Sequence, residues 1–251
     1  MRVVFCGQVP KDPNYPESTE DAAEIAPDAG RLAISDGASE SFDSKTWAQL
    51  LVRAFARSPG LSPDWLSEVV RQYNAHYDVS TLSWSKHAAF ERGSFATLLG
   101  VEEFPAHAAV DVLSIGDSLA VLLSKSGMID SFPYNDAQQF QQRPELFCTN
   151  PSHNGFLGEP DFFSRHHKTW DLRQLENPVA LCMTDALGEW ALRLAHEGSP
   201  QWEALLSITD NAQLQALIRS EREHRRMRVD DVTFVSIAFD GGVTPNELPH
   251  A

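Results

Sequence analysis

Segments with the composition of β-strands occur in groups along this chain, and blocks with helical periodicity separate the groups. Runs rich in Val, Leu, Ile and Phe, each ending in turn residues, predict strands at 3–6, 22–26, 32–34, 94–101, 108–115, 120–123, 179–183 and 232–238. Apolar residues at helical spacing predict helices from Lys45, from Pro63, and over 189–196 and 212–222. Grouping without strict alternation favours an α+β fold with antiparallel sheets between helix layers, and a doubly wound parallel fold is the alternative.

The domain organisation follows from the lack of internal divisions. No linker rich in Gly, Ser or Pro interrupts the 251 residues and no repeat recurs, so we expect one domain over 1–240. Two glycines and two prolines in 241–251 predict a flexible tail. The segment 131–171 has no sustained period, and it is interpreted either as a flap over the functional site or as an irregular insertion.

The charge balance limits the partners. With 35 acidic and 20 basic side chains the net charge is −15, which disfavours nucleic acid and anionic membrane surfaces. Cation binding is compatible with this charge, although an acidic surface also simply keeps a protein soluble. The three cysteines show no metal-ligand spacing and no apolar run is long enough to cross a bilayer, so we expect a cytoplasmic protein.

One strand end carries a candidate functional carboxylate. The apolar run 32–34 stops at Ser35, and Asp36 and Gly37 follow it directly. A carboxylate beside an accessible carbonyl offers two hard oxygen donors to Mg²⁺ or Mn²⁺. An isolated Asp-Gly pair is also typical of a hairpin turn, so the interpretation depends on other carboxylates reaching the same place.

Four aspartates share a position at the edge of a predicted strand: Asp21, Asp36, Asp185 and Asp230. If these strand ends are neighbours, the like charges repel by several kcal/mol unless cations offset them. Two divalent ions about 4 Å apart clamp an in-line displacement and acidify a water, which makes a phosphate ester the natural substrate.

Six short motifs then carry a resemblance. They are Glu20-Asp21, Ser35-Asp36-Gly37, Gly93-Ser94-Phe95-Ala96-Thr97, Gly116-Asp117-Ser118, Thr184-Asp185-Ala186-Leu187 and Asp230-Asp231-Val232-Thr233. In order and approximate spacing the chain resembles the metal-dependent protein phosphatases of type 2C, as a divergent, bacterial-type member. The resemblance implies a β-sandwich flanked by helix layers (α-β-β-α) with two Mn²⁺ or Mg²⁺ ions at one end. It also implies hydrolysis of phosphoserine or phosphothreonine in a phosphorylated protein by a hydroxide that bridges the ions, with a cognate Ser/Thr kinase as a further partner.

Carried over by position, the resemblance assigns ligands. Asp36 would bridge both ions, and the carbonyl of Gly37 would bind the first. Asp185 and Asp230 would hold the second ion, and Asp21 would act mainly through bound waters. Asp36 and Asp21 are therefore the implied catalytic residues.

Two further acidic residues have lesser implied roles. Glu20 would support the ligands from outside the metal shell. Asp117 would contribute to a weaker third metal position, and a tight turn between two strands is the alternative interpretation of its motif.

The chain departs from the family pattern in two places. Better-known members carry an arginine shortly before the Glu-Asp pair and a histidine directly after Asp-Gly, whereas this chain has no arginine in 15–19 and has Ala38. We hypothesise that Arg225, Arg226 or Arg228 supplies the phosphate contact, because a guanidinium grips two phosphate oxygens. A solvated basic turn is the alternative.

Other chemistries find less support. His166 and His167 form the only adjacent histidine pair and lack a third ligand at suitable spacing, so we expect them to be exposed polar residues. Ser39 has no second glycine behind it and does not form a nucleophile elbow. The competing functional hypothesis is a phosphatase-like module without activity that senses or binds partners.

Overall fold

Antiparallel pairing joins the strands of residues 1–240, which are the residues that the computed structural model describes, into two large sheets. The first sheet has the order β1 (Arg2–Val9), β12 (Val232–Ala238), β11 (Val179–Met183), β7 (Leu119–Ser124) and β8 (Gly127–Phe132). The second has the order β10 (His167–Asp171), β6 (Ala109–Ile115), β5 (Leu98–Phe104), β3 (Arg31–Ser35) and β2 (Ala22–Ala26). A small third sheet pairs β4 (Phe95–Ala96) with β9 (Phe147–Cys148).

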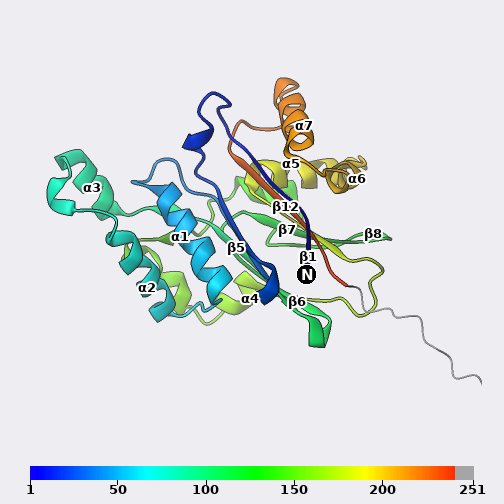
Figure 1. The fold of residues 1–251 in the computed structure, drawn as a ribbon, viewed down its shortest axis with the longest axis horizontal. Helices are drawn as coiled ribbons and strands as arrows, with labels where there is room; N and C mark the ends of the chain where they lie inside the picture. The colour runs from blue at the N-terminus through cyan, green and yellow to red at the C-terminus, as the bar shows by residue number, and fades with distance from the viewer. Residues whose placement is uncertain (241–251) are drawn as a thin grey trace, which may run out of the picture.

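Helices cover the outer faces of the two sheets (Figure 1). The second sheet carries α1 (Ser44–Arg57) and α2 (Pro63–Asn74). The first sheet carries α5 (Asp185–His196), α6 (Gln201–Leu206) and α7 (Asn211–Glu223). Two more helices are α3 (Trp84–Arg92) and α4 (Phe162–His166). The layers therefore follow the order α-β-β-α, which confirms the predicted α+β fold class.

Three apolar cores hold the layers together, and β3 shows how one strand serves two of them. Leu32 and Ile34 point into the core between the sheets, whereas Ala33 packs in the core under α1. All three are fully buried. Successive side chains of a strand point to opposite faces, so a strand covered on both sides needs a continuous apolar run.

The helix predicted from Pro63 begins there, and the one predicted from Lys45 begins one residue earlier, at Ser44. The carboxylate of Asp43 accepts a hydrogen bond from the backbone N–H of Thr46 at 3.1 Å, and α1 begins at the next residue. The hydroxyl of Ser62 accepts from the N–H of Trp65 at 3.1 Å, and α2 begins at Pro63. Each cap satisfies a donor that the first helical turn leaves free.

The structure contains several helices and strands that the sequence does not predict. No residue of α3 is buried, so no apolar stripe marks that helix, and the first three residues of β8 are exposed. The segment 131–171 contains β9, α4 and β10, and β10 is the edge strand beside β6. That this segment acts as a flap stays a prediction. The predicted tail at 241–251 lies outside the described residues. No helix within 1–240 is long and apolar enough to cross a membrane.

One histidine expectation was wrong. His166 is buried, with 8% of its surface exposed, and its Nδ1 lies 2.8 Å from the backbone oxygen of Ser114. It therefore belongs to the packing of α4 against β6 and not to an exposed polar surface.

Candidate active site

Asp21 and Asp36 flank the hairpin of β2 and β3 at the same end. Ala22 pairs with Ser35 in the register of these strands, so the residues just outside that pair are Asp21 and Asp36. The chain after Gly37 continues into α1, so the Asp-Gly pair is not a hairpin turn. Strand geometry therefore brings together two of the carboxylates that the sequence singled out.

Asp21 is buried between strands of both sheets. Its Oδ2 accepts hydrogen bonds from the hydroxyls of Thr184 at 3.0 Å and Thr233 at 2.8 Å, and its Oδ1 is buried without a partner. Burial is the main reason that the pKa of Asp21 is raised to about 7, and the charges of Asp231 and Asp230 raise it further. The hydrogen bonds from the two hydroxyls lower this pKa. A carboxylate in this setting needs a cation or a proton.

Asp36 lies within electrostatic reach of three other carboxylates. Burial raises the pKa of Asp36 well above its usual value, and the charges of Asp21, Asp230 and Asp117 raise it further. The guanidinium of Arg228 acts in the opposite direction. Asp117 occupies the turn between β6 and β7, where burial also raises its pKa. Four of the aspartates predicted from the sequence thus lie within electrostatic reach of one another at one end of the sandwich.

Asp185 joins this cluster through Arg228. It is the first residue of α5 and only 8% exposed. Its Oδ2 pairs with the Arg228 guanidinium, and its Oδ1 is buried without a hydrogen-bond partner. The charge of Arg228 also lowers the pKa of Asp36 and of Asp117, so this arginine links Asp185 to the other aspartates.

Two of the motifs form the framework behind Asp36. The backbone N–H of Asp36 donates to the Thr97 hydroxyl at 2.8 Å, and the N–H of Thr97 donates to the Asp36 carbonyl at 2.8 Å. The hydroxyls of Thr97 and Ser118 lie 3.0 Å apart. A Cβ atom at Gly116 would lie 2.6 Å from Thr97 Cγ2, so only glycine fits beside that threonine.

Gly37 and Glu20 fix the start of α1 against the site. A Cβ atom at Gly37 would lie 2.8 Å from the Cβ atom of Ser44. The Glu20 carboxylate accepts hydrogen bonds from Lys11, Ser39 and Ser44. Burial raises the pKa of Glu20, but these donors outweigh it and the pKa ends below its usual value. Glu20 is thus held as a carboxylate beside the aspartates, which is compatible with a supporting role.

Asp231, for which the sequence predicts no role, is the buried anchor of this region. Its carboxylate accepts backbone N–H bonds from Lys11 at 2.6 Å and from Glu20 at 2.9 Å. Arg222, also without a predicted role, donates to the backbone oxygens of Pro10 and Asp230. Figure 1 shows the dark-blue loop after β1 beside the red segment before β12, the two segments that these bonds connect.

The three arginines proposed for phosphate binding separate in the structure. Arg226 makes two hydrogen bonds to Glu221, at 2.7 and 2.6 Å. Arg225 is exposed, with a backbone φ of 57°. Only Arg228 of the three reaches the aspartate cluster, through Asp185.

The aspartates fit the expected divalent ions in chemistry but not in spacing. No three Asp, Glu, His or Cys side chains within residues 1–240 come close enough to form a metal-binding group. Two buried carboxylate oxygens nevertheless lack partners, Asp21 Oδ1 and Asp185 Oδ1, and Arg228 is the cation that Asp185 holds here. Unpartnered carboxylate oxygens fit hard cations such as Mg²⁺ and Mn²⁺. The residues therefore offer oxygen ligands of the kind that such ions prefer. Arg228 would compete with an ion for the Asp185 carboxylate.

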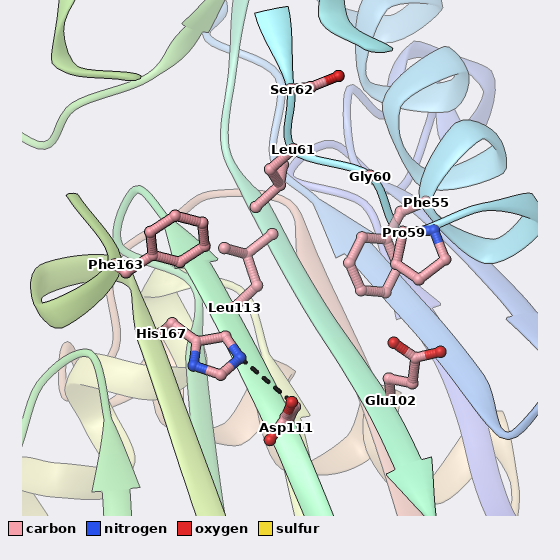
Figure 2. A pocket seen from close by; sticks show the side chains of 10 residues that line it. All are labelled: Phe55, Pro59, Gly60, Leu61, Ser62, Glu102, Asp111, Leu113, Phe163 and His167. Atoms are coloured by element: carbon pink, nitrogen blue, oxygen red, sulfur yellow. Dashed lines mark ion pairs between the residues drawn. The ribbon is translucent and has the colours of Figure 1, made fainter. Parts of the chain in front are cut away.

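A separate hollow of about 420 Å³ lies on the outer side of the second sheet (Figure 2). Phe55 and Phe163 form opposite walls, and His167 faces Asp111 at 3.3 Å. None of the candidate aspartates or arginines lines it. The largely apolar hollow is thus unrelated to the cluster at the sheet ends.

The raised pKa of Asp21 predicts how the metal-free protein responds to pH. Between about pH 4 and 7 the folded protein keeps a proton that the unfolded chain has lost, so stability falls as pH rises, by about 1.4 kcal/mol per pH unit from this group. We expect urea unfolding in EDTA to show this decline. Asp21→Asn should flatten it, whereas equal pH profiles for the variant and the wild type would contradict the assignment.

Comparisons with known proteins agree with this architecture. The sequence matches no protein-family model and no curated protein. The catalytic domain of the serine/threonine protein phosphatase PstP, solved in complex with two manganese ions, superposes with a TM-score of 0.54 at 19% identity, over 96% of this chain and 100% of that one. A serine/threonine phosphatase from Staphylococcus aureus gives 0.53 at 14% identity, over 95% and 96%.

The photosystem II phosphatase PBCP gives a TM-score of 0.54 at 13% identity, over 95% of this chain and 99% of that one. Identities this low show the fold alone. The similarity extends over nearly the full length of each chain, so it includes both sheets and the helix layers. The chain therefore has the fold of the type 2C protein phosphatases.

Proposed function

We propose that this protein is a metal-dependent phosphatase that hydrolyses phosphoserine or phosphothreonine esters in a phosphorylated protein substrate. The observation that supports the proposal is that Asp21, Asp36, Asp117 and Asp230 lie within electrostatic reach of one another at one end of the sandwich, with Asp185 linked to them through Arg228. The manganese ions of the PstP catalytic domain support the same chemistry. A Ser/Thr kinase that makes the substrate is the expected counterpart.

The proposed ligands are the aspartates at this end of the sandwich. Asp36 would serve both ions, the Gly37 carbonyl would bind the first, and Asp185 and Asp230 would hold the second. Asp21 contributes its free Oδ1 to the same space, and the turn residue Asp117 is a candidate for a weaker third position. When bound, the ions supply an acidified water as nucleophile and offset the charge on the phosphoryl oxygens.

The structure favours Arg228 as the phosphate contact. It adjoins Asp185 and lies within electrostatic reach of Asp36 and Asp117. A charge-assisted guanidinium contact contributes about 1.5–3 kcal/mol, so Arg228→Ala is expected to raise KM for a phosphopeptide roughly 10- to 100-fold. The exposed Arg53 on α1 provides a matched control, Arg53→Ala, with KM unchanged.

A second measurement separates a contact to phosphate from a general loss of charge. Arg228→Ala frees the Asp185 carboxylate from its ion pair, so Mn²⁺ should bind at least as tightly as in the wild type. Isothermal titration with Mn²⁺ reads this directly. An unchanged KM in Arg228→Ala would exclude the residue as the phosphate contact.

The competing function is a phosphatase-like module without activity. Ala38 stands where better-known members have a histidine, and no complete metal-binding group forms within residues 1–240. Hydrolysis of p-nitrophenyl phosphate, measured with Mn²⁺ and with EDTA, separates the two functions. We expect a Mn²⁺-dependent release of p-nitrophenol, and its absence would favour the binding module.

A further inference from the structure

Two adjoining hollows open beside the aspartate cluster. The first, the arginine hollow, has a volume of about 540 Å³, and its lining includes Glu189 and five arginines: Arg193, Arg222, Arg225, Arg226 and Arg228. The second, the proline hollow, has a volume of about 550 Å³ and includes Val9, Pro10, Pro13 and Pro16 in its lining. Arg222 and Val229 line both, so the two hollows form one surface, named here the docking groove.

The charge of the docking groove opposes that of the whole molecule. Five arginines gather in one hollow of a chain whose net charge is −15. Arg193, Arg226 and Arg228 pair with carboxylates. Exposed Arg225, and exposed Arg219 in the proline hollow, make no ion pair within residues 1–240. The acidic residues of the lining are Glu189, which pairs with Arg193, and Glu223, against six arginines and Lys11. The groove therefore keeps an excess of positive charge.

The groove also offers apolar surface at a defined place. Val229 is 67% exposed, which is unusual for a large apolar side chain, and it lies where the two hollows meet. The prolines of the neighbouring loop add apolar area on a stiff backbone. A ligand that fits both hollows must combine negative charge with an apolar side chain.

The groove connects directly to the candidate active site. Arg222 donates to the backbone oxygen of Asp230, and Arg228 pairs with Asp185. Lys11, which lines the proline hollow, pairs with Glu20 at 2.8 Å. A chain segment in the groove would thus lie next to a phosphorylated residue bound at the aspartates.

We propose that the docking groove binds an acidic segment of the phosphoprotein substrate, next to the residue that is dephosphorylated. Acidic side chains of the segment lie against Arg219, Arg222 and Arg225, and an apolar side chain packs on Val229 and the prolines. The proposal rests on the proposed phosphatase function and adds the substrate class. Charge complementarity between the positive groove and an acidic segment favours this occupant. A second copy of the chain is disfavoured, because two whole molecules with a net charge of −15 each repel one another.

The test uses a fluorescein-labelled peptide rich in Asp and Glu with one Leu, and its analogue with Asn and Gln at the acidic positions. Fluorescence anisotropy is measured in EDTA, where hydrolysis plays no part. We expect the full-length protein to bind the acidic peptide at least about tenfold more tightly than the analogue, and less tightly as salt is added. Equal affinities for the two peptides would overturn the proposal.

Two exposed arginines can be neutralised with little effect on folding. Arg225→Asn suits the positive φ at that position, and Arg219→Gln keeps a good helix former in α7. The double variant is expected to bind the acidic peptide roughly fivefold more weakly, as two exposed charge contacts are lost. Arg53→Gln on α1, in the opposite outer layer, is the control with unchanged affinity. A loss below twofold in the double variant would contradict the proposal.

The apolar part of the groove has its own test. Val229→Ser should weaken binding of the Leu-containing acidic peptide and leave an all-polar acidic peptide unaffected. Tighter binding of a single-stranded oligonucleotide than of the acidic peptide, or a dimer in light scattering that the peptide does not dissociate, would assign the groove to another occupant and overturn the proposal.

The outcome is separable from that of the proposed function. Mn²⁺-dependent hydrolysis of p-nitrophenyl phosphate without preference for the acidic peptide would remove the docking proposal alone. Preference for the acidic peptide in a protein that releases no p-nitrophenol would remove the phosphatase proposal and keep an acidic-segment binding site.

Discussion

Asp36→Asn is expected to lower the Mn²⁺-dependent hydrolysis of p-nitrophenyl phosphate by a factor of about a thousand or more. The charges of Asp21, Asp117 and Asp230 all act on the Asp36 carboxylate, so it lies within electrostatic reach of three of the other candidate ligands. A neutral amide of the same size removes the charge that would balance two divalent ions. Such ions stabilise the transition state by several kcal/mol, and a loss of about 4 kcal/mol lowers the rate about a thousandfold.

The same substitution should not destabilise the metal-free protein. In EDTA the charged form of Asp36 is disfavoured by burial and by its neighbours, so an amide relieves repulsion and the urea midpoint should stay equal or rise. Mn²⁺ should then raise the midpoint of the wild type more than that of the variant. Asp28→Asn, at the exposed far end of the same β2–β3 hairpin, is the charge-matched control. Near wild-type turnover in Asp36→Asn would refute the assignment.

The sequence could predict the parts of the fold that depend on local pattern. The buried run 32–34 predicts β3 because both faces of the strand are covered, and Ser62-Pro63 predicts the start of α2 because capping acts within one turn. Asp21 and Asp36 could be singled out because each flanks a strand, and antiparallel pairing then makes them neighbours.

The supporting contacts of the site could not be predicted in this way. Thr184 and Thr233 hold Asp21 from 163 and 212 positions away, and no periodicity connects residues so distant. The arginine hollow also brings together distant parts of the chain, since Arg193 lies on α5 and Arg222 on α7. Such contacts depend on the order of strands in the sheets, which local pattern does not fix.

Asp231→Ala is expected to cost roughly 2–5 kcal/mol of the free energy of unfolding. Asp231 is 3% exposed, and its carboxylate accepts hydrogen bonds from the backbone N–H groups of Lys11 and Glu20. Alanine leaves both donors without an acceptor in a partly buried place, and each such loss costs about 1–3 kcal/mol. Urea unfolding at neutral pH measures the change, and Asp231→Asn, which keeps one acceptor oxygen, should lose about half as much.

Asp230→Ala provides the contrast, because the two adjacent aspartates differ in what their carboxylates contact. The Asp230 side chain is only partly buried and accepts the backbone N–H of Asp231 at 2.9 Å. Its removal should therefore change stability by less than about 1 kcal/mol while lowering Mn²⁺-dependent turnover. Equal losses of stability in the two alanine variants would mean that Asp231 does not anchor the loop after β1. If the contrast holds, Asp231 positions the segment that carries Glu20 and Asp21, and Asp230 remains free for a cation.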